Sequence, residues 1–164
     1  MKTFVISDLH FGHKNIIDYC HRPFSSVEEM DEQMILRWNS VVGDQDTVYF
    51  GGDFQFYKND RYLFERLNGR YKYLVIGNHD HKLVKNMDWV HVDKRFEFLH
   101  HDVWVVLDHY PLYDWNKSTQ GSIHLHGHTH DKVLPYVKNR FSMNAEHLNY
   151  TPCDLDDFMK RREV

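Results

Sequence analysis

The sequence has few of the residues that mark specialised classes of protein. Only two of its 164 residues are cysteines, Cys20 and Cys153, and their separation fits neither a disulfide-rich scaffold nor a paired-cysteine metal site. No apolar run is long enough to span a bilayer, and the first residues become polar too early for a signal peptide. We therefore expect a cytoplasmic protein without a membrane segment, in which both thiols stay reduced.

A strong excess of charge of one sign is also missing. The chain has 20 Lys plus Arg against 24 Asp plus Glu, a formal net charge of -4. This balance gives no broad basic surface, so a nucleic-acid substrate would have to be held locally by metal ions. Repeats, low-complexity tracts and Pro/Gly/Ser-rich linkers are lacking too. These features predict one domain over residues 1–164 with a sizeable core.

Histidine is the residue type that is abundant. The chain has 14 histidines, which are spread from His10 to His147, and no run of them exceeds two residues. A purification tag would be one continuous run, so the distribution indicates metal chemistry, proton chemistry or both.

The apolar pattern predicts an α/β fold. Short strands are expected at 3–7, 47–50 and 71–76, with helices at 26–42 and 61–68 between them. Ser26 and Glu29 form a capping box at the start of the first of these helices. Alternation of strands and helices favours parallel pairing, with functional residues at the carboxyl ends of the strands.

The second half of the chain changes character. Strands are expected at 95–99, 103–107, 122–125 and 140–144 with little helix between them, followed by a helix at 154–162 that Asp154 caps. Both halves together predict two facing mixed β-sheets, a sandwich, flanked by helices.

Short polar islands follow the predicted strands. In chain order they are Asp8-Leu9-His10, Gly52-Asp53, Gly77-Asn78-His79-Asp80, His109-Tyr110-Pro111 and Gly127-His128-Thr129-His130. Mixed nitrogen and oxygen ligands suit Mn, Fe, Co, Ni or Zn better than an all-oxygen Ca or Mg site. There are enough ligands for two ions, so the pattern indicates a two-metal hydrolase with a binuclear metal centre.

The residue types within these polar islands suggest two roles, metal ligation and proton donation. Asp8 and His10 are two positions apart and can face one ion, whereas the carboxylate of Asp53 could bridge two ions. The side chain of His79 is a candidate proton donor, and Asp80 beside it could orient the His79 ring. Each island alone has an ordinary structural interpretation, such as a turn or a surface pair. Their combination in this order favours a site.

The full set resembles the calcineurin-like metallophosphoesterase superfamily, whose pattern is D-x-H, G-D, G-N-H-D/E, a single His and G-H-x-H. The resemblance covers residues 8–130. Small bacterial and phage phosphoesterases are more similar than the protein Ser/Thr phosphatases, because Phe54-Gln55-Phe56 follows Asp53 in place of an Asp-Arg-Gly extension. Those phosphatases also have Glu where this chain has Asp80, and they are about twice as long.

The resemblance implies a ligand set and a mechanism. One ion would be held by Asp8, His10, Asp53 and His130, and the other by Asp53, Asn78, His109 and His128. A hydroxide that bridges the ions would attack phosphorus, and His79 would act near the leaving group with Asp80 as its partner. Mn²⁺ is the expected metal, with Fe, Zn, Ni or Co as alternatives.

Substrate contacts are expected from two residues outside the motifs, His13 and Arg22. The favoured activity is that of a phosphodiesterase on a small phosphodiester, a cyclic nucleotide or a nucleic-acid end. A phosphomonoesterase or nuclease on the same site is the nearest alternative, and a non-catalytic scaffold or metal-binding module is another. No specific protein partner can be inferred.

Overall fold

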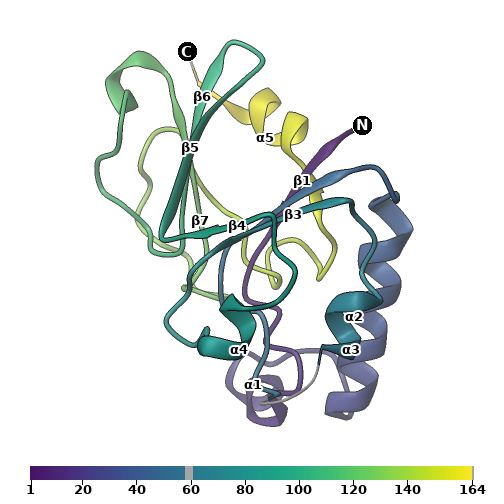
Figure 1. Ribbon diagram of the computed structural model, residues 1–164. Helices are drawn as coiled ribbons and strands as arrows, with labels where there is room; N and C mark the ends of the chain where they lie inside the picture. Colours follow the sequence, from purple (N-terminus) through teal and green to yellow (C-terminus); the bar gives the residue numbers. More distant parts are fainter. Residues whose placement is uncertain (58–60, 164) are drawn as a thin grey trace.

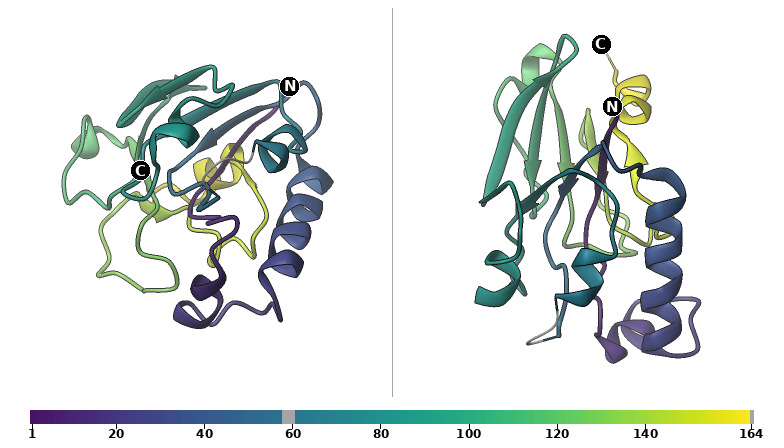
Figure 2. Two further views of the ribbon diagram at one scale, coloured as in Figure 1. Left: turned by 60° about the horizontal axis from the view of Figure 1, so that its bottom comes forward. Right: turned by 45° about the vertical axis from the view of Figure 1, so that its right-hand side comes forward.

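The computed structural model of the protein describes residues 1–57 and 61–163. Two β-sheets lie face to face, and the helices of the first half cover the outer face of the first sheet (Figures 1 and 2). This arrangement confirms the predicted α/β sandwich. No helix within the described ranges is both long and apolar enough to cross a membrane.

The first sheet has the strand order β4-β3-β2-β1-β9. Its strands are β1 (Thr3–Ile6), β2 (Thr47–Phe50), β3 (Tyr71–Val75), β4 (His91–Asp93) and β9 (Cys153–Asp154). The first four are parallel, as expected from their alternation with helices, and β9 runs antiparallel to β1.

The second sheet has the order β5-β6-β7-β8. Its strands are β5 (Arg95–His100), β6 (Val103–Asp108), β7 (Ile123–His126) and β8 (Arg140–Ser142). β5 and β6 form an antiparallel hairpin, whereas β7 and β8 continue the sheet in parallel.

The helices are short except for one. They are α1 (Lys14–Tyr19), α2 (Val27–Val41), α3 (Tyr62–Glu65), α4 (Lys82–Lys85) and α5 (Leu155–Arg161), with a 3₁₀ turn at Ser118–Gln120. One apolar core lies between the first sheet and α1, α2 and α3. The other lies between the sheets, where α5 contributes Leu155 and Phe158.

Helix α2 forms where the capping pattern predicts it. The Ser26 hydroxyl accepts a hydrogen bond from the Glu29 amide at 3.1 Å, and Met30, Met34 and Trp38 are buried on one face. The reciprocal half of the capping box differs, because the Glu29 carboxylate accepts from Ser25 rather than from the amide of Ser26.

The carboxyl ends of strands from both sheets meet at one end of the sandwich. An isolated parallel bridge pairs Ser7, just after β1, with Asn144, just after β8. Backbone hydrogen bonds also join Asp8 to Gly52 at 2.9 Å and Gly127 to His109 at 3.0 Å. In Figure 1, β1 runs from the N-terminus toward this end, where α1 lies. The polar islands that follow β1, β2, β3, β6 and β7 are thereby brought together.

Candidate metal centre

The backbone at the site is locally strained. Five of the residues singled out in the sequence adopt left-handed conformations, with φ of 58° at Asp8, 53° at His10, 59° at Asp53, 69° at His128 and 51° at His130. Such conformations cost side chains other than glycine about 1 kcal/mol or more each. The paired strands on either side hold these turns in place, so that consecutive side chains can face the same point.

Asp8, His10 and His130 form one group of possible ligands. Asp8 Oδ1 lies 3.9 Å from His10 Nε2 and 3.9 Å from His130 Nε2. Neither ring nitrogen of His10 has a hydrogen-bond partner among the described residues, although the residue is only 1% exposed. A buried imidazole without partners beside a buried carboxylate is the environment that a divalent cation would satisfy.

Asp53 lies between this group and a second one. Its Oδ2 is 3.6 Å from His10 Nε2 and 3.5 Å from His109 Nε2, and its Oδ1 accepts a hydrogen bond from the His79 amide at 2.8 Å. One carboxylate oxygen is therefore fixed by the backbone, and the other faces imidazoles on both sides.

Asn78, His109 and His128 make up the second group. Asn78 Oδ1 lies 2.9 Å from His109 Nε2 and 3.0 Å from His128 Nδ1. The other ring nitrogen of His109, Nδ1, is 2.8 Å from the carbonyl oxygen of Gly51. Donation of Nδ1–H to that carbonyl leaves Nε2 available as a ligand.

The charged forms of His109 and Asp53 stabilise each other. Burial disfavours a charged His109, yet its hydrogen bond to Asp53 and the charges of Asp8 and Asp53 outweigh burial and raise the pKa of His109 to about 9. Burial also opposes ionisation of Asp53, but the partnership with His109 lowers the pKa of Asp53 below its usual value. The carboxylate of Asp53 is thus held in its ionised form, which favours a cationic partner.

Two motif glycines allow the carboxylates to approach the backbone. A Cβ on Gly127 would overlap Asp8 Oδ2 and lie 2.7 Å from Ser7 Oγ. A Cβ on Gly77 would overlap Asp53 Oδ1 and lie 2.5 Å from the Asp53 nitrogen. These two islands need glycine because any side chain would displace a candidate ligand.

The structure corrects the expected role of Asp80. Its carboxylate accepts hydrogen bonds from the amides of Asp53, Phe54 and Gly77 at 2.8–2.9 Å. Among the hydrogen bonds of the described residues, none joins Asp80 to the His79 ring. Because three backbone amides already bind its oxygens, Asp80 connects the loop after β2 to the loop after β3 and does not orient the ring of His79.

The structure also corrects the expected role of Arg22 as a substrate contact. Its side chain is fully buried and donates to the carbonyl oxygens of Leu9 and Asp8, both at 2.7 Å, and to Glu146 Oε1 at 2.7 and 3.0 Å. The prediction failed because a surface arginine and a buried one look alike in sequence. Arg22 fixes the loop that carries Asp8 and His10.

Glu146 is a residue of the centre that the motifs do not reveal. Its Oε1 lies 3.1 Å from His130 Nδ1, so the His130 ring presents Nε2 toward Asp8. Burial opposes the charged form of Glu146, but the hydrogen bond with His130 and the charge of Arg22 lower its pKa to about 2. The Arg22–Glu146 pair spans 124 positions, so no local sequence signal could have found it.

His79 and His13 line a cavity of about 330 Å³ beside the centre, together with His10, His128 and His130. The His79 side chain is exposed there, with its ring 5.6 Å from that of His10. The His13 ring stacks on Phe56 at 3.9 Å. Burial, with the charges of His10 and His79, lowers the pKa of His13 to about 4, so this ring is neutral near pH 7.

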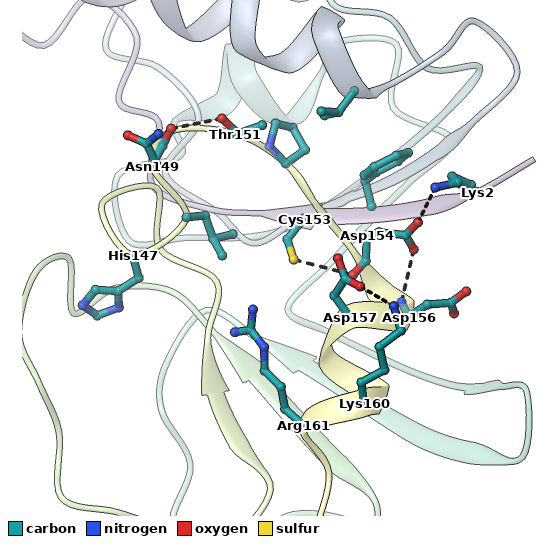
Figure 3. Close-up of a pocket in the computed structure, with 14 residues that line it drawn as sticks. Lys2, His147, Asn149, Thr151, Cys153, Asp154, Asp156, Asp157, Lys160 and Arg161 are labelled. Carbon is teal, nitrogen blue, oxygen red and sulfur yellow. Dashed lines mark hydrogen bonds and ion pairs between the residues drawn. The ribbon is translucent and has the colours of Figure 1, made fainter.

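A cavity of about 840 Å³ lies elsewhere, along β9, α5 and the segment before them (Figure 3). It contains none of the motif residues. Four of its charged side chains form two ion pairs, Lys2 with Asp154 at 2.8 Å and Lys160 with Asp157 at 2.7 Å.

Comparison with known proteins places the chain among relatives of matching length. It is 37% identical over 170 residues to the uncharacterized protein MJ1445 of Methanocaldococcus jannaschii, a match that covers 97% of this chain and 90% of the relative. It is 31% identical over 164 residues to the Gene 66 protein of Mycobacterium phage L5, covering 80% and 79% of the two chains. No family model matches the chain.

The fold also occurs in a solved structure. AQ665 of Aquifex aeolicus, a protein of unknown function, matches over 98% of both chains with a TM-score of 0.81 and 24% identity. At 37% identity over 97% of its length, the chain belongs to the same family as the M. jannaschii protein.

Proposed function

We propose that this protein is a two-metal-dependent phosphoester hydrolase, with phosphodiesters as its favoured substrates. The observation that carries the proposal is the position of Asp53 Oδ2, which lies 3.6 Å from His10 Nε2 and 3.5 Å from His109 Nε2. A single carboxylate oxygen between two groups of ligands is what a binuclear centre requires. Asp8, His10, Asp53 and His130 would hold one ion, and Asp53, Asn78, His109 and His128 the other.

The ions would supply Lewis-acid stabilisation of the phosphoryl oxygens and a water of lowered pKa. Mixed nitrogen and oxygen ligands favour Mn²⁺ or another first-row ion. The chain itself would supply the proton: His79 is exposed beside the centre and can donate to the departing oxygen. The His79 amide bond to Asp53 Oδ1, at 2.8 Å, links the position of this donor to that of the ligands.

The preference for a diester is supported by space on both sides of the centre. One cavity of about 330 Å³ lies beside His10 and His130. Another of about 330 Å³ lies beside Asn78 and includes Lys94 and Tyr110. A phosphodiester has two organic substituents, and the two cavities could receive one each, whereas a monoester would use only one of them.

The test is Mn²⁺-dependent hydrolysis of bis-p-nitrophenyl phosphate and of p-nitrophenyl phosphate by the wild type, Asp53→Asn and His79→Ala. We expect the diester to be hydrolysed, Asp53→Asn to lose bound metal and activity, and His79→Ala to keep metal while kcat falls by about 10²–10⁴-fold. His91→Ala, which removes an exposed histidine on β4, is the matched control and should retain activity.

Two results would redirect the proposal. Preference for the monoester would favour a phosphomonoesterase on the same site. A folded protein that binds metal but hydrolyses neither ester with Mn, Fe, Co, Ni or Zn would contradict a hydrolase and favour a scaffold or a metal-binding module.

A further inference from the structure

Two histidines and an aspartate converge at the far end of the second sheet. His100 is the last residue of β5, His101 follows in the turn to β6, and Asp156 lies in the first turn of α5. His100 Nε2 is 2.7 Å and His101 Nε2 is 3.1 Å from the same oxygen, Asp156 Oδ1. None of these residues belongs to the motifs of the candidate metal centre.

The backbone of the turn brings the two rings together. Adjacent residues of a regular strand point to opposite faces of the sheet, so His100 and His101 would normally diverge. His101 instead has a φ of 48°, in the left-handed region, and the two ring centroids are 4.4 Å apart. Both imidazoles therefore face Asp156 on the same side of the hairpin.

This cluster is remote from the candidate metal centre. His100 pairs with Val103, at the start of β6, whereas the ligand His109 follows the end of that strand. The length of β6 separates them by about 17 Å along the strand, at roughly 3.4 Å per residue. An ion at the cluster could not share ligands with the ions of the centre.

We propose that His100, His101 and Asp156 bind one borderline divalent cation, with Zn²⁺ as the expected ion. Two imidazole nitrogens and one carboxylate oxygen are a donor set that Zn²⁺, Ni²⁺ or Cu²⁺ prefers over Mg²⁺ or Ca²⁺. The ligand atoms already lie within 4.8 Å of one another. Half of the Asp156 side chain and most of the His101 side chain are exposed, so water can complete the coordination.

The bound ion would join two elements that are distant in sequence. Asp156 comes from α5 and also lines the cavity of Figure 3. The cation would attach the β5–β6 hairpin to α5, whose Leu155 and Phe158 lie in the core between the sheets. We therefore expect binding to raise the melting temperature.

The test measures Zn²⁺ binding in Asp53→Asn, in which the candidate metal centre is disrupted, and in the same protein with His101→Ala or Asp156→Asn added. Titration calorimetry should show that Asp53→Asn binds one more equivalent of Zn²⁺ than either double variant. Alternatively, the double variants should bind the same number of ions with an affinity for Zn²⁺ that is lower by about tenfold or more. The side-chain ¹⁵N resonances of His100 and His101 should shift with Zn²⁺ in the parent.

His91→Ala is the matched control, because His91 lies 3.8 Å from one carboxylate, that of Asp93, and belongs to none of the possible metal-ligand groups found among the described residues. It should leave the stoichiometry unchanged. Equal stoichiometry and affinity with and without His101 would overturn the proposal and leave the cluster as a hydrogen-bonded ion pair. Because activity is not measured, this result is independent of whether the proposed hydrolase function holds.

Discussion

Among the hydrogen bonds and ion pairs of the described residues, Glu146 contacts the candidate metal ligands through His130. Its carboxylate lies 3.1 Å from His130 Nδ1, and Arg22 holds that carboxylate with two hydrogen bonds. A carboxylate behind a ligating imidazole also raises the basicity of the ligand. The orientation of His130 therefore depends on Glu146 and Arg22 and not on the G-H-x-H motif alone.

The contacts of Glu146 with His130 and Arg22 predict that its charge strengthens metal binding. Glu146→Gln keeps the shape of the side chain but removes the charge, so the metal affinity should fall by about 10–100-fold. Titration calorimetry with Mn²⁺ measures the change. Glu65→Gln, on the exposed surface of α3, is the control and should bind as the wild type does. Wild-type affinity in Glu146→Gln would show that His130 is oriented without Glu146.

Gly127 shows how strictly a motif residue is constrained by its surroundings. In Gly127→Ala the new methyl group would overlap Asp8 Oδ2, so the carboxylate or the loop must move. We expect weaker metal binding and a loss of about 1–3 kcal/mol in the free energy of unfolding. Urea denaturation and metal titration measure the two effects.

Gly43→Ala provides the comparison for Gly127→Ala. Its Cβ would come no nearer than 3.3 Å to a neighbour, the end of the Asp46 side chain, and Gly43 does not require a positive φ. This variant should bind metal normally. If both alanine variants behave alike, the close approach of Asp8 to the backbone does not determine the site.

At the scale of secondary structure, the stability of α2 depends on its N-cap residue, Ser26. The Ser26 hydroxyl accepts from the Glu29 amide, and Ser26→Ala removes this cap, which should lower the free energy of unfolding by about 1 kcal/mol. Ser40→Ala changes an exposed serine within the same helix, where alanine is the better helix former, and should be neutral or slightly stabilising. Urea denaturation of both variants makes the comparison, and equal destabilisation would contradict the capping role.

The elements that could be predicted are those with a local signal. Helix α2 has a cap and an apolar face, and β1, β2 and β3 are apolar runs that end at polar islands. The sequence did not indicate β4 or β9, since strands of three and two residues show no periodicity. It also missed α4 and gave no clear signal for α1, both of which are only one or two turns long.

The candidate ligands could be proposed because they follow predicted strands and match the motif pattern of the calcineurin-like metallophosphoesterases. Arg22, Asp80 and Glu146 were misjudged or missed, since their roles depend on partners that are distant in sequence or on backbone amides. Arg22 contacts Asp8 and Glu146, which are 14 and 124 positions away in the sequence, so these contacts depend on the folded structure and not on a local pattern. Roles that arise from burial therefore remain beyond inference from a single sequence.

At the scale of the whole molecule, metal binding and protonation should be coupled. The pKa of His109 is raised to about 9 and that of His130 to about 10, so both rings are protonated at pH 7 before metal binds. Burial lowers the pKa of His10 and of His128, and these rings are neutral. Binding must therefore displace about two protons at pH 7.

The same shifts determine how stability depends on pH. A histidine whose pKa is raised by folding stabilises the metal-free protein fully below its usual pKa of 6.5, and this contribution is lost as the pH rises toward 9 and 10. Metal takes the place of those protons, so the increase in melting temperature on adding Mn²⁺ should be larger at pH 8 than at pH 6. Calorimetry at pH 7 in two buffers of different ionisation enthalpy counts the released protons. Identical apparent enthalpies in both buffers would mean that no protons are released and that the carboxylates do not hold His109 and His130 in the charged form.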